Sequence, residues 1–275
     1  MIIVIQCKDQ LGLVATISSL IAGAGLNIIS MREHVEKSEA RFFTRIEAEG
    51  NSDAAILQQQ LQSALPADAD ISINPLPEKK IIALVTKEHH CLGDLLIRNH
   101  FKTLGATLQC VIGNYNNLED VCKRFEVPFH YITHEGKSKE AFEKEIHSVI
   151  QMYGTGYLVL ARFMRILSPE FVKKYERCII NIHHSFLPAF AGANPYRQAY
   201  ERGVKLIGAT SHFVTNDLDE GPIIVQQIIP VTHAHTSEAM IRSGKEIEKA
   251  VMAQALQLVF EDRVLVHKNK TIVFE

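Results

Sequence analysis

The sequence predicts an α/β protein in which a ferredoxin-like βαββαβ domain is followed by a doubly wound, mostly parallel sheet. A β-α-β-β-α-β order of patterns runs through residues 1–75, which we expect to form the first domain. The stretch NPLPEKK then combines two prolines with three charges and shows no periodicity, so we place a linker at 76–80. In the expected second domain, 81–275, continuous apolar runs alternate with helical segments, as in parallel strands joined by helices.

The composition is that of an ordinary globular protein, with 47% hydrophobic and 22% charged residues among 275. The net charge of −2 argues against a nucleic-acid binder that relies on a broad basic field. No stretch approaches the roughly 18 apolar residues of a membrane span, and the start, MIIVIQCKDQ, lacks the features of a signal peptide. Five scattered cysteines without a C-x-x-C motif favour a reduced, cytoplasmic protein. We therefore expect neither nucleic acid nor membrane as a partner.

Local patterns define six elements in the first domain. A turn containing Gly12 leads from an apolar run into an apolar helix, and the turn EKSE between two extended segments predicts a hairpin. Ser52 is a suitable N-cap for the second helix, and Pro66 ends it. The expected elements are a strand at 2–7, a helix at 12–24, strands at 26–35 and 40–48, a helix at 52–65 and a strand at 70–73.

The second domain begins with strands and helices in alternation and becomes strand-rich after residue 200. The run IIALVT is typical of a parallel strand buried on both faces. Ser168 and Pro169 form an N-cap followed by proline at the first helical position. The expected strands are 81–86, 106–113, 127–133, 157–161, 178–183, 205–214 and 222–231, with a hairpin at 264–274, and the expected helices are 91–105, 117–125, 137–150, 169–175 and 236–260.

The first turn resembles that of the ACT family of small regulatory modules. The matching residues are Asp9, Gly12, Leu13 and Val14, followed by Leu26-Asn27-Ile28. A turn at Gly12 leaves the N-terminal amides of the helix free to bind a carboxylate. The resemblance implies an amino-acid effector near Asp9, Gly12, Leu13, Val14 and Asn27, and a homo-oligomer formed where such domains pair. The alternative is that Gly12 and Asn27 serve only the geometry of the turn.

Thirteen histidines suggest a metal site, but their spacing argues against one. Neighbouring residues of a strand point to opposite faces, so His183 and His184 are not expected to share an ion. His233 and His235 have no third ligand at a recognisable spacing, and neither H-E-x-x-H nor a cysteine pair occurs near HHC at 89–91. The stretch TKEHHCLG after the first strand of this domain is no dinucleotide or phosphate-loop signature. We expect no metal and no permanently bound cofactor.

An Asn-x-His pair at the end of the fifth strand of this domain is the leading catalytic candidate. Asn181 and His183 lie two residues apart, so their side chains point to the same side, at the sheet edge where ligands bind. Asp219 lies in DEGPII, where Gly221 and Pro222 fix a turn. An amide, an imidazole and a carboxylate are the groups needed for polar attack on a carbonyl. On spacing alone the signal is weak, because many proteins contain such residues.

From about residue 80 onward the sequence resembles the formyltransferase family, whose members use 10-formyltetrahydrofolate. The run N-x-H-x-S-x-L-P, an S-H strand and D-x-G-x-I-x-x-Q occur in the family's order, and FMRILSP at 163–169 matches the segment that lines the folate pocket. The resemblance implies that Asn181, His183 and Asp219 are the catalytic residues. The matching residues are Asn181, His183, Ser185, Leu187, Pro188, His212, Asp219, Gly221, Ile223 and Gln226.

The same resemblance implies which residues bind the folate substrate. They are Met164, Arg165, Ile166 and Leu167, together with His212. The pterin would lie along the first four, with Met164 and Leu167 as apolar walls, while Arg165 faces either the folate or solvent. Without the resemblance, MRIL reads as an ordinary apolar loop before a helix.

Two departures from the transferase pattern indicate which branch of the family this is. His184 stands where the transferases carry proline, and we expect its side chain to point away from Asn181 and His183. KEHHCL at 87–92 replaces the loop of small residues that cradles the substrate phosphate in glycinamide ribonucleotide transferases. There, His89 and His90 either shape a water site or only fill space. Together with the ACT-like domain, these departures resemble the formyltetrahydrofolate deformylases.

This resemblance implies a hydrolase that converts 10-formyltetrahydrofolate and water into formate and tetrahydrofolate, which supplies formate for purine synthesis and balances the one-carbon folate pools. Asp219 would orient and deprotonate water, directly or through His183, while His183 and Asn181 stabilise the formyl oxygen. Formyl transfer to an amine such as glycinamide ribonucleotide is the nearest alternative. A regulatory protein that binds folate without releasing formate is another, against which the intact set of Asn181, His183 and Asp219 argues.

Overall fold

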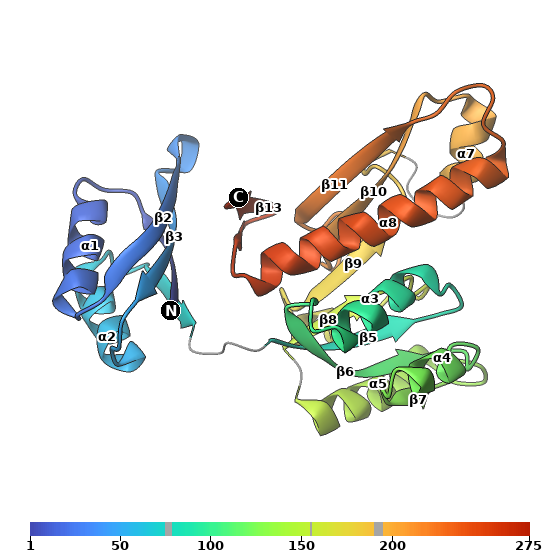
Figure 1. Cartoon of the computed structure of the whole chain (residues 1–275), viewed down its shortest axis with the longest axis horizontal. Coiled ribbons are helices and arrows are strands. Elements are labelled where there is room, and N and C mark those ends of the chain that lie inside the picture. Colours follow the sequence, from blue (N-terminus) through green and yellow to red (C-terminus); the bar gives the residue numbers. More distant parts are fainter. Residues whose placement is uncertain (75–78, 155, 190–194) are drawn as a thin grey trace. The chain divides into compact units, whose positions relative to one another are not determined.

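The computed structural model describes residues 1–74, 79–154, 156–189 and 195–275, and the chain in it divides into two compact units (Figure 1). The first unit contains Met1–Pro77, Asp262–His267 and Ile272–Glu275, and the second contains Glu78–Glu261 and Lys268–Thr271. The second domain was expected to extend through 275, whereas the C-terminal segments are divided between the units. Of the expected linker 76–80, residues 76–78 lie outside the described residues, and the other two begin a strand.

The first unit has the predicted βαββαβ order. Its four strands form an antiparallel sheet in the order β2-β3-β1-β4, and α1 and α2 lie together on one face of it (Figure 1). Fully buried isoleucines and leucines from both helices join the core against that face. The elements are β1 (Ile2–Lys8), α1 (Leu13–Gly23), β2 (Asn27–Glu36), the 3-10 turn η1 (Lys37–Glu39), β3 (Arg41–Glu49), α2 (Ala54–Ala64) and β4 (Asp70–Asn74).

Two details of the first unit differ from what the pattern suggested. The N-cap of α2 is Asp53, not Ser52, because the Asp53 carboxylate accepts hydrogen bonds from the backbone N–H groups of Ala55 and Ile56. Strand β3 shows poor alternation because both of its faces are covered. Phe42 packs into the helix-side core, while Phe43 packs against Leu265 and Phe274 of the C-terminal segments.

The second unit is built on a seven-stranded sheet in the order β11-β10-β9-β8-β5-β6-β7. Strands β9, β8, β5, β6 and β7 run parallel, and β10 and β11 are antiparallel additions at one edge. The predicted doubly wound, mostly parallel sheet is therefore confirmed. The strands are β5 (Lys79–Val85), β6 (Ala106–Gly113), β7 (Phe129–Tyr131), β8 (Tyr157–Leu160), β9 (Ile179–His183), β10 (Leu206–Phe213) and β11 (Ile223–Pro230), and β12 (Val264–His267) with β13 (Lys270–Val273) forms the C-terminal hairpin.

Helices cover the sheet of the second unit. Residues of α5 and α6 pack against Ile82 and Leu84 in one apolar cluster, while α3 and α8 contact each other and lie side by side in Figure 1. Short, polar α7 was not predicted from the sequence, whereas Ser168 is the N-cap of α6 as expected. The helices are α3 (His90–His100), α4 (Glu119–Arg124), α5 (Lys139–Tyr153), α6 (Pro169–Lys174), α7 (Pro195–Arg202) and α8 (Ser237–Phe260).

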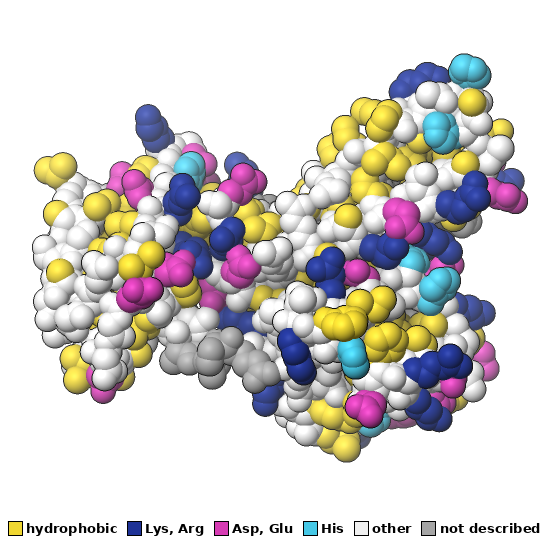
Figure 2. All heavy atoms as spheres, in the orientation of Figure 1, with side chains coloured by type: hydrophobic (Ala, Val, Ile, Leu, Met, Phe, Trp, Pro, Cys, Tyr) yellow, Lys and Arg dark blue, Asp and Glu magenta, His cyan; other side chains and the backbone are white. Residues whose placement is uncertain are grey.

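The strand order reverses between β5 and β8, where ligands bind in sheets of this kind. No helix among the described residues combines the length and the apolar character needed to cross a bilayer. On the face seen in Figure 2, acidic and basic side chains are interspersed over the second unit.

Replacing Gly221 by alanine should destabilise the second unit, because a Cβ at this position would lie 1.8 Å from the carbonyl oxygen of Phe213. We expect a loss of about 1–3 kcal/mol in the free energy of unfolding, as at other overpacked sites. Gly93→Ala in α3 is the matched control, since its Cβ meets nothing within 4 Å and helix propensity favours alanine. Urea denaturation followed by circular dichroism measures both. Wild-type stability in G221A would contradict the close approach.

Candidate active site

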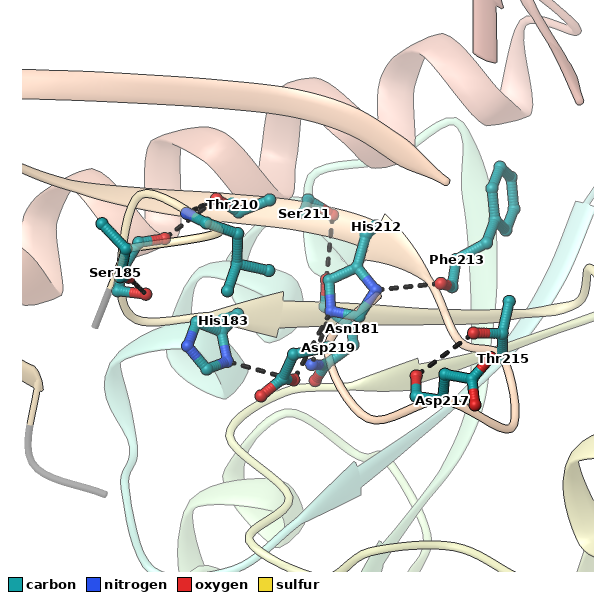
Figure 3. Close-up of polar contacts among 12 residues, drawn as sticks. Asn181, His183, Ser185, Thr210, Ser211, His212, Phe213, Thr215, Asp217 and Asp219 are labelled. Carbon is teal, nitrogen blue, oxygen red and sulfur yellow. Dashed lines mark hydrogen bonds and ion pairs between the residues drawn. The ribbon is translucent and has the colours of Figure 1, made fainter. Parts of the chain in front are cut away.

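The predicted catalytic residues meet at one end of the second sheet. Asn181 and His183 end β9, His212 faces Asn181 from the neighbouring strand β10, and Asp219 lies in the connection from β10 to β11 (Figure 3). All four line a cavity of about 260 Å³. The period-two argument for Asn181 and His183 thus agrees with the structure, and the approach of Asp219 results from the β10–β11 connection.

His183 and Asp219 form a hydrogen-bonded pair. The Nδ1 of His183 lies 3.2 Å from a carboxylate oxygen of Asp219. Burial alone would raise the pKa of Asp219, but the hydrogen bond from His183 and the nearby imidazoles outweigh it, so the pKa lies below its ordinary value. The Nε2 of His183 is buried without a hydrogen-bond partner among the described residues. The carboxylate is therefore ionised and fixes one side of the ring, which leaves the other nitrogen for a ligand.

His212 positions the side chain of Asn181. Its Nδ1 must donate to the carbonyl oxygen of Phe213 at 2.9 Å, because a carbonyl cannot donate. The Nε2 atom of the neutral ring then accepts a hydrogen bond from the amide of Asn181 at 3.2 Å. Burial lowers the pKa of His212, which keeps the ring neutral. The ring lies at the cavity but is only 2% exposed, so its contacts indicate that it positions Asn181.

The predicted folate-binding segment lines the same cavity. Met164 and Ile166 are exposed and Leu167 is buried, so the segment presents apolar side chains on one side of the cavity. The backbone N–H of Met164 donates to the hydroxyl of Thr86 at 2.9 Å, which ties the segment to the end of β5. Arg165 also lines the cavity. The sequence did not single out Thr86, which it placed at the end of the expected strand 81–86.

A buried carboxylate supports the far end of this segment. Glu143 of α5 accepts hydrogen bonds from the backbone N–H of Ser168, at 2.7 Å, and from its hydroxyl group. The same hydroxyl oxygen caps α6 by accepting from Phe171 N–H. Segment 163–167 is thus anchored at both ends, a requirement for a rigid binding loop.

Other residues of the sequence motif hold the loop after β9. The Thr210 hydroxyl donates to the carbonyl of Ser185 at 2.9 Å and accepts from the N–H of Leu187. Gln226 donates to the carbonyl of Leu187 and to Thr210. The Ser, Leu and Gln of the motif therefore stabilise the loop that follows the catalytic strand.

The expectation that His184 points away from His183 was wrong. Strand β9 ends at His183, so the alternation rule no longer applies to the next residue. The two rings lie 5.2 Å apart, and both line the cavity. Burial, followed by the charge of Arg162, lowers the pKa of His184 to about 3. His184 is therefore a neutral group beside His183.

A buried polar cluster behind His184 was missed by the sequence analysis. Glu248 of α8 is 1% exposed and contacts His90 Nε2 and the Tyr196 hydroxyl, both at 2.8 Å, and Arg162 Nε at 3.5 Å. Burial would raise the pKa of Glu248, but its contacts with His90 and Arg162 hold it below the ordinary value. The sequence signal for this cluster was the position of Glu248 on the apolar face of the helix α8.

The same cluster contains potential metal ligands. The ligand atoms of His90, Cys91 and Glu248 lie within 4.8 Å of one another. However, the Glu248 charge is already met by His90 and Arg162, and burial raises the pKa of the Cys91 thiol. This donor set therefore fits a hydrogen-bonded cluster better than a metal centre.

The predicted effector residues occupy the β1–α1 turn and the start of β2. Gly12 adopts a φ of 88° at the N-cap of α1, where no side chain caps the helix. Val14 is exposed, whereas Leu13 is buried in the core and contributes packing. Asp9 donates its backbone N–H to Ala40, and Asn27 is exposed at the start of β2.

His184→Gln should reduce the loss of stability of the second unit between pH 7.5 and 5. The folded-state pKa of about 3 lies below the ordinary 6.5, so stability is complete above pH 6.5 and is lost as the pH falls toward 3. At pH 5 this group alone should remove about 2 kcal/mol. Urea denaturation at both pH values measures the loss, and exposed His100→Gln is the control. Identical losses in wild type and H184Q would contradict the burial argument.

Comparison with known proteins identifies the families of the two domains. Residues 79–256 match the family model described as formyl transferase, and residues 1–65 match that of the ACT domain. A formyltetrahydrofolate deformylase of Haemophilus influenzae is 46% identical over 272 residues, which cover 99% of this chain and 98% of that protein.

Among solved structures, a deformylase matches the whole chain and a transformylase matches only part of it. The crystal structure of a formyltetrahydrofolate deformylase from Pseudomonas syringae matches with a TM-score of 0.94 and 38% identity, over 100% of this chain and 94% of that chain. A glycinamide ribonucleotide transformylase from Symbiobacterium toebii matches with a TM-score of 0.68 and 30% identity, over 72% of this chain and 95% of that chain. The chain belongs to the formyltetrahydrofolate deformylases, hydrolases that join an ACT domain to a formyl transferase domain.

Proposed function

We propose that this protein hydrolyses 10-formyltetrahydrofolate to formate and tetrahydrofolate. The observation that carries the proposal is the His183–Asp219 pair, which lines the same cavity as segment 163–167 and in which Nε2 of His183 has no hydrogen-bond partner among the described residues. The deformylase relatives carry this activity in their names. The product formate would supply purine synthesis, and the reaction would balance the one-carbon folate pools.

The geometry supports general acid–base catalysis by His183. Its Nδ1–H donates to the ionised Asp219, so Nε2 of the neutral ring accepts a proton from the attacking water. Asp219 stabilises the imidazolium that forms, and this imidazolium then gives the proton to N10 of the folate as it leaves. Asn181 uses one amide N–H to bond His212, and the other is left to donate to the formyl oxygen.

The folate is proposed to lie along Met164–Leu167. The segment is anchored at Thr86 and Glu143, and its exposed apolar side chains suit the face of the pterin ring. The ring edge can be read by backbone groups of the same segment. No permanently bound cofactor takes part in these steps, because folate itself is the substrate.

Asp219→Asn should lower kcat by a factor on the order of 10²–10³ or more. The amide neither stabilises the imidazolium form of His183 nor orients its ring as the carboxylate does. KM for the folate should change little, since Asp219 is proposed to act on His183 and not on the folate. Formate release from 10-formyltetrahydrofolate measures both constants. Asp120→Asn, on the exposed face of α4, is the matched control. Near wild-type turnover of D219N would remove Asp219 from the catalytic set.

The same assay separates the remaining alternatives. A deformylase releases formate from 10-formyltetrahydrofolate alone, whereas a transferase consumes the substrate only after an amine such as glycinamide ribonucleotide is added. A regulatory folate-binding protein binds the substrate and releases no formate. The fit of the full-length deformylase structure, compared with the partial fit of the transformylase, supports hydrolysis.

The first unit is proposed to bind an amino-acid effector and to mediate self-association. The support is the free helix N-terminus at Gly12, together with the exposed Leu11 and Val14 beside it. A cytoplasmic location is part of the proposal, supported by five cysteines that are all unpaired thiols.

An effector should change formate release when the twenty amino acids are tested one by one at fixed folate concentration. Val14→Asp should abolish that response and weaken association, because it places a negative charge beside the amides that would hold the effector carboxylate. Basal turnover should remain, since Val14 lies in the first unit. Sedimentation velocity gives the oligomeric state. Absence of any response would reject the effector proposal while leaving the hydrolase proposal intact.

A further inference from the structure

One guanidinium group that lines the candidate active-site cavity has few partners among the described residues. Arg162 lies two residues after the end of β8, and its side chain, 13% exposed, lines the cavity with His183 and Asp219. Among the described residues, its Nε is buried without a hydrogen bond, and its one ion pair, to Glu248, is 3.5 Å long. Buried donors in proteins are nearly always satisfied, so a guanidinium left in this state indicates a missing acceptor.

Glu248 fixes Arg162 in place without fully occupying it. The carboxylate already accepts hydrogen bonds from His90 of α3 and Tyr196 of α7. Gly244 allows this approach, because a Cβ there would lie 2.1 Å from the Tyr196 ring. Residues from α3, α7 and the segment after β8 thus meet at the Glu248 carboxylate. Of these contacts of Glu248, the one with Arg162 is the longest. The cation keeps much of its capacity to bind a second anion.

Hydrolysis creates such an anion in this cavity. The formyl amide is neutral. After water adds and N10 departs, the product formate carries a full negative charge that its two oxygens share. Arg162 lines this cavity with His183, and among the described residues the one ion pair of its guanidinium runs from Nε to Glu248. The planar fork of the guanidinium has further N–H donors, and this arrangement suits a small carboxylate.

We propose that Arg162 is a further catalytic residue, which binds the oxygen delivered by water and then holds the formate, and that Glu248 is its positioning residue. This inference rests on the hydrolysis proposed above. The water oxygen bonds to the formyl carbon, and the C–N10 bond breaks with its electron pair on N10. N10 receives the first proton that water gave to His183, the second proton of water passes through the again neutral His183 to solvent, and formate leaves with the negative charge. Because the charge appears only during the reaction, Arg162 acts on kcat more than on KM.

Arg162→Gln tests the assignment with two independent readouts. Titration with ¹³C-formate followed by NMR should show at least a tenfold loss of formate affinity in the folate-free variant. Formate release should show kcat lowered by a factor on the order of 10² with KM within about threefold of wild type. Arg124→Gln, exposed and paired with Asp120 on α4, is the matched control and should behave as wild type in both assays. Unchanged formate affinity and kcat within twofold of wild type would overturn the proposal.

A second experiment covers the case in which Arg162→Gln fails to fold. In wild-type protein labelled with ¹⁵N-arginine, the Nε–H resonance of Arg162, identified by its loss in the charge-conserving Arg162→Lys, should shift on addition of formate. Glu248→Gln should weaken formate binding while the D219N variant retains it. No shift of this resonance at saturating formate would overturn the proposal.

The formate-binding and turnover results also separate this inference from the hydrolysis proposal. Wild-type protein that binds formate through Arg162 but releases none from the folate would contradict only the hydrolysis proposal. Wild-type formate release with unchanged R162Q would contradict only the role of Arg162.

Discussion

The hydrogen bond between His183 and Asp219 is the contact on which the candidate site depends. It requires an imidazole at the end of a parallel strand and a carboxylate in a connection that returns to the same sheet edge. The connection is held tightly: Gly221 passes against the Phe213 carbonyl, and Asp219 adopts a φ of 58°, unusual for a residue with a side chain. Strain at this position is consistent with a functional constraint, because the carboxylate is placed there by the surrounding structure.

Three further polar contacts hold the surroundings of this pair. His212 holds Asn181 beside the pair, and its neutral state follows from burial and from its bond to the Phe213 carbonyl. Glu143 and Thr86 anchor the segment that forms the apolar side of the cavity. Each contact joins residues far apart in the sequence, so the site is rigid only when the sheet and helices of the second unit are complete.

The buried cluster around Glu248 adds charge to a site that otherwise resembles that of a formyl transferase domain. Arg162 and His184 border the cavity on the side of this cluster, one cationic and one neutral. The cluster also accounts for the sequence departure at 87–92, since His90, which stands where the transferases carry their phosphate loop, binds Glu248. The sequence showed that small residues were absent there, and the structure shows what replaces them.

The sequence by itself determined the α/β fold class with its two kinds of domain, and it predicted Asn181, His183 and Asp219 as the catalytic residues, because strand and helix periods and spaced motifs are local properties. The sequence did not predict the short helix α7, it predicted Ser52 and not Asp53 as the N-cap of α2, and it predicted the wrong direction for the His184 side chain. The last two features depend on the position of an element's end to within one or two residues. Only the tertiary structure decided that Arg162, His90 and Tyr196 meet at Glu248. Their meeting depends on how α3, α7 and α8 pack on the sheet, and no local pattern in the sequence encodes that packing.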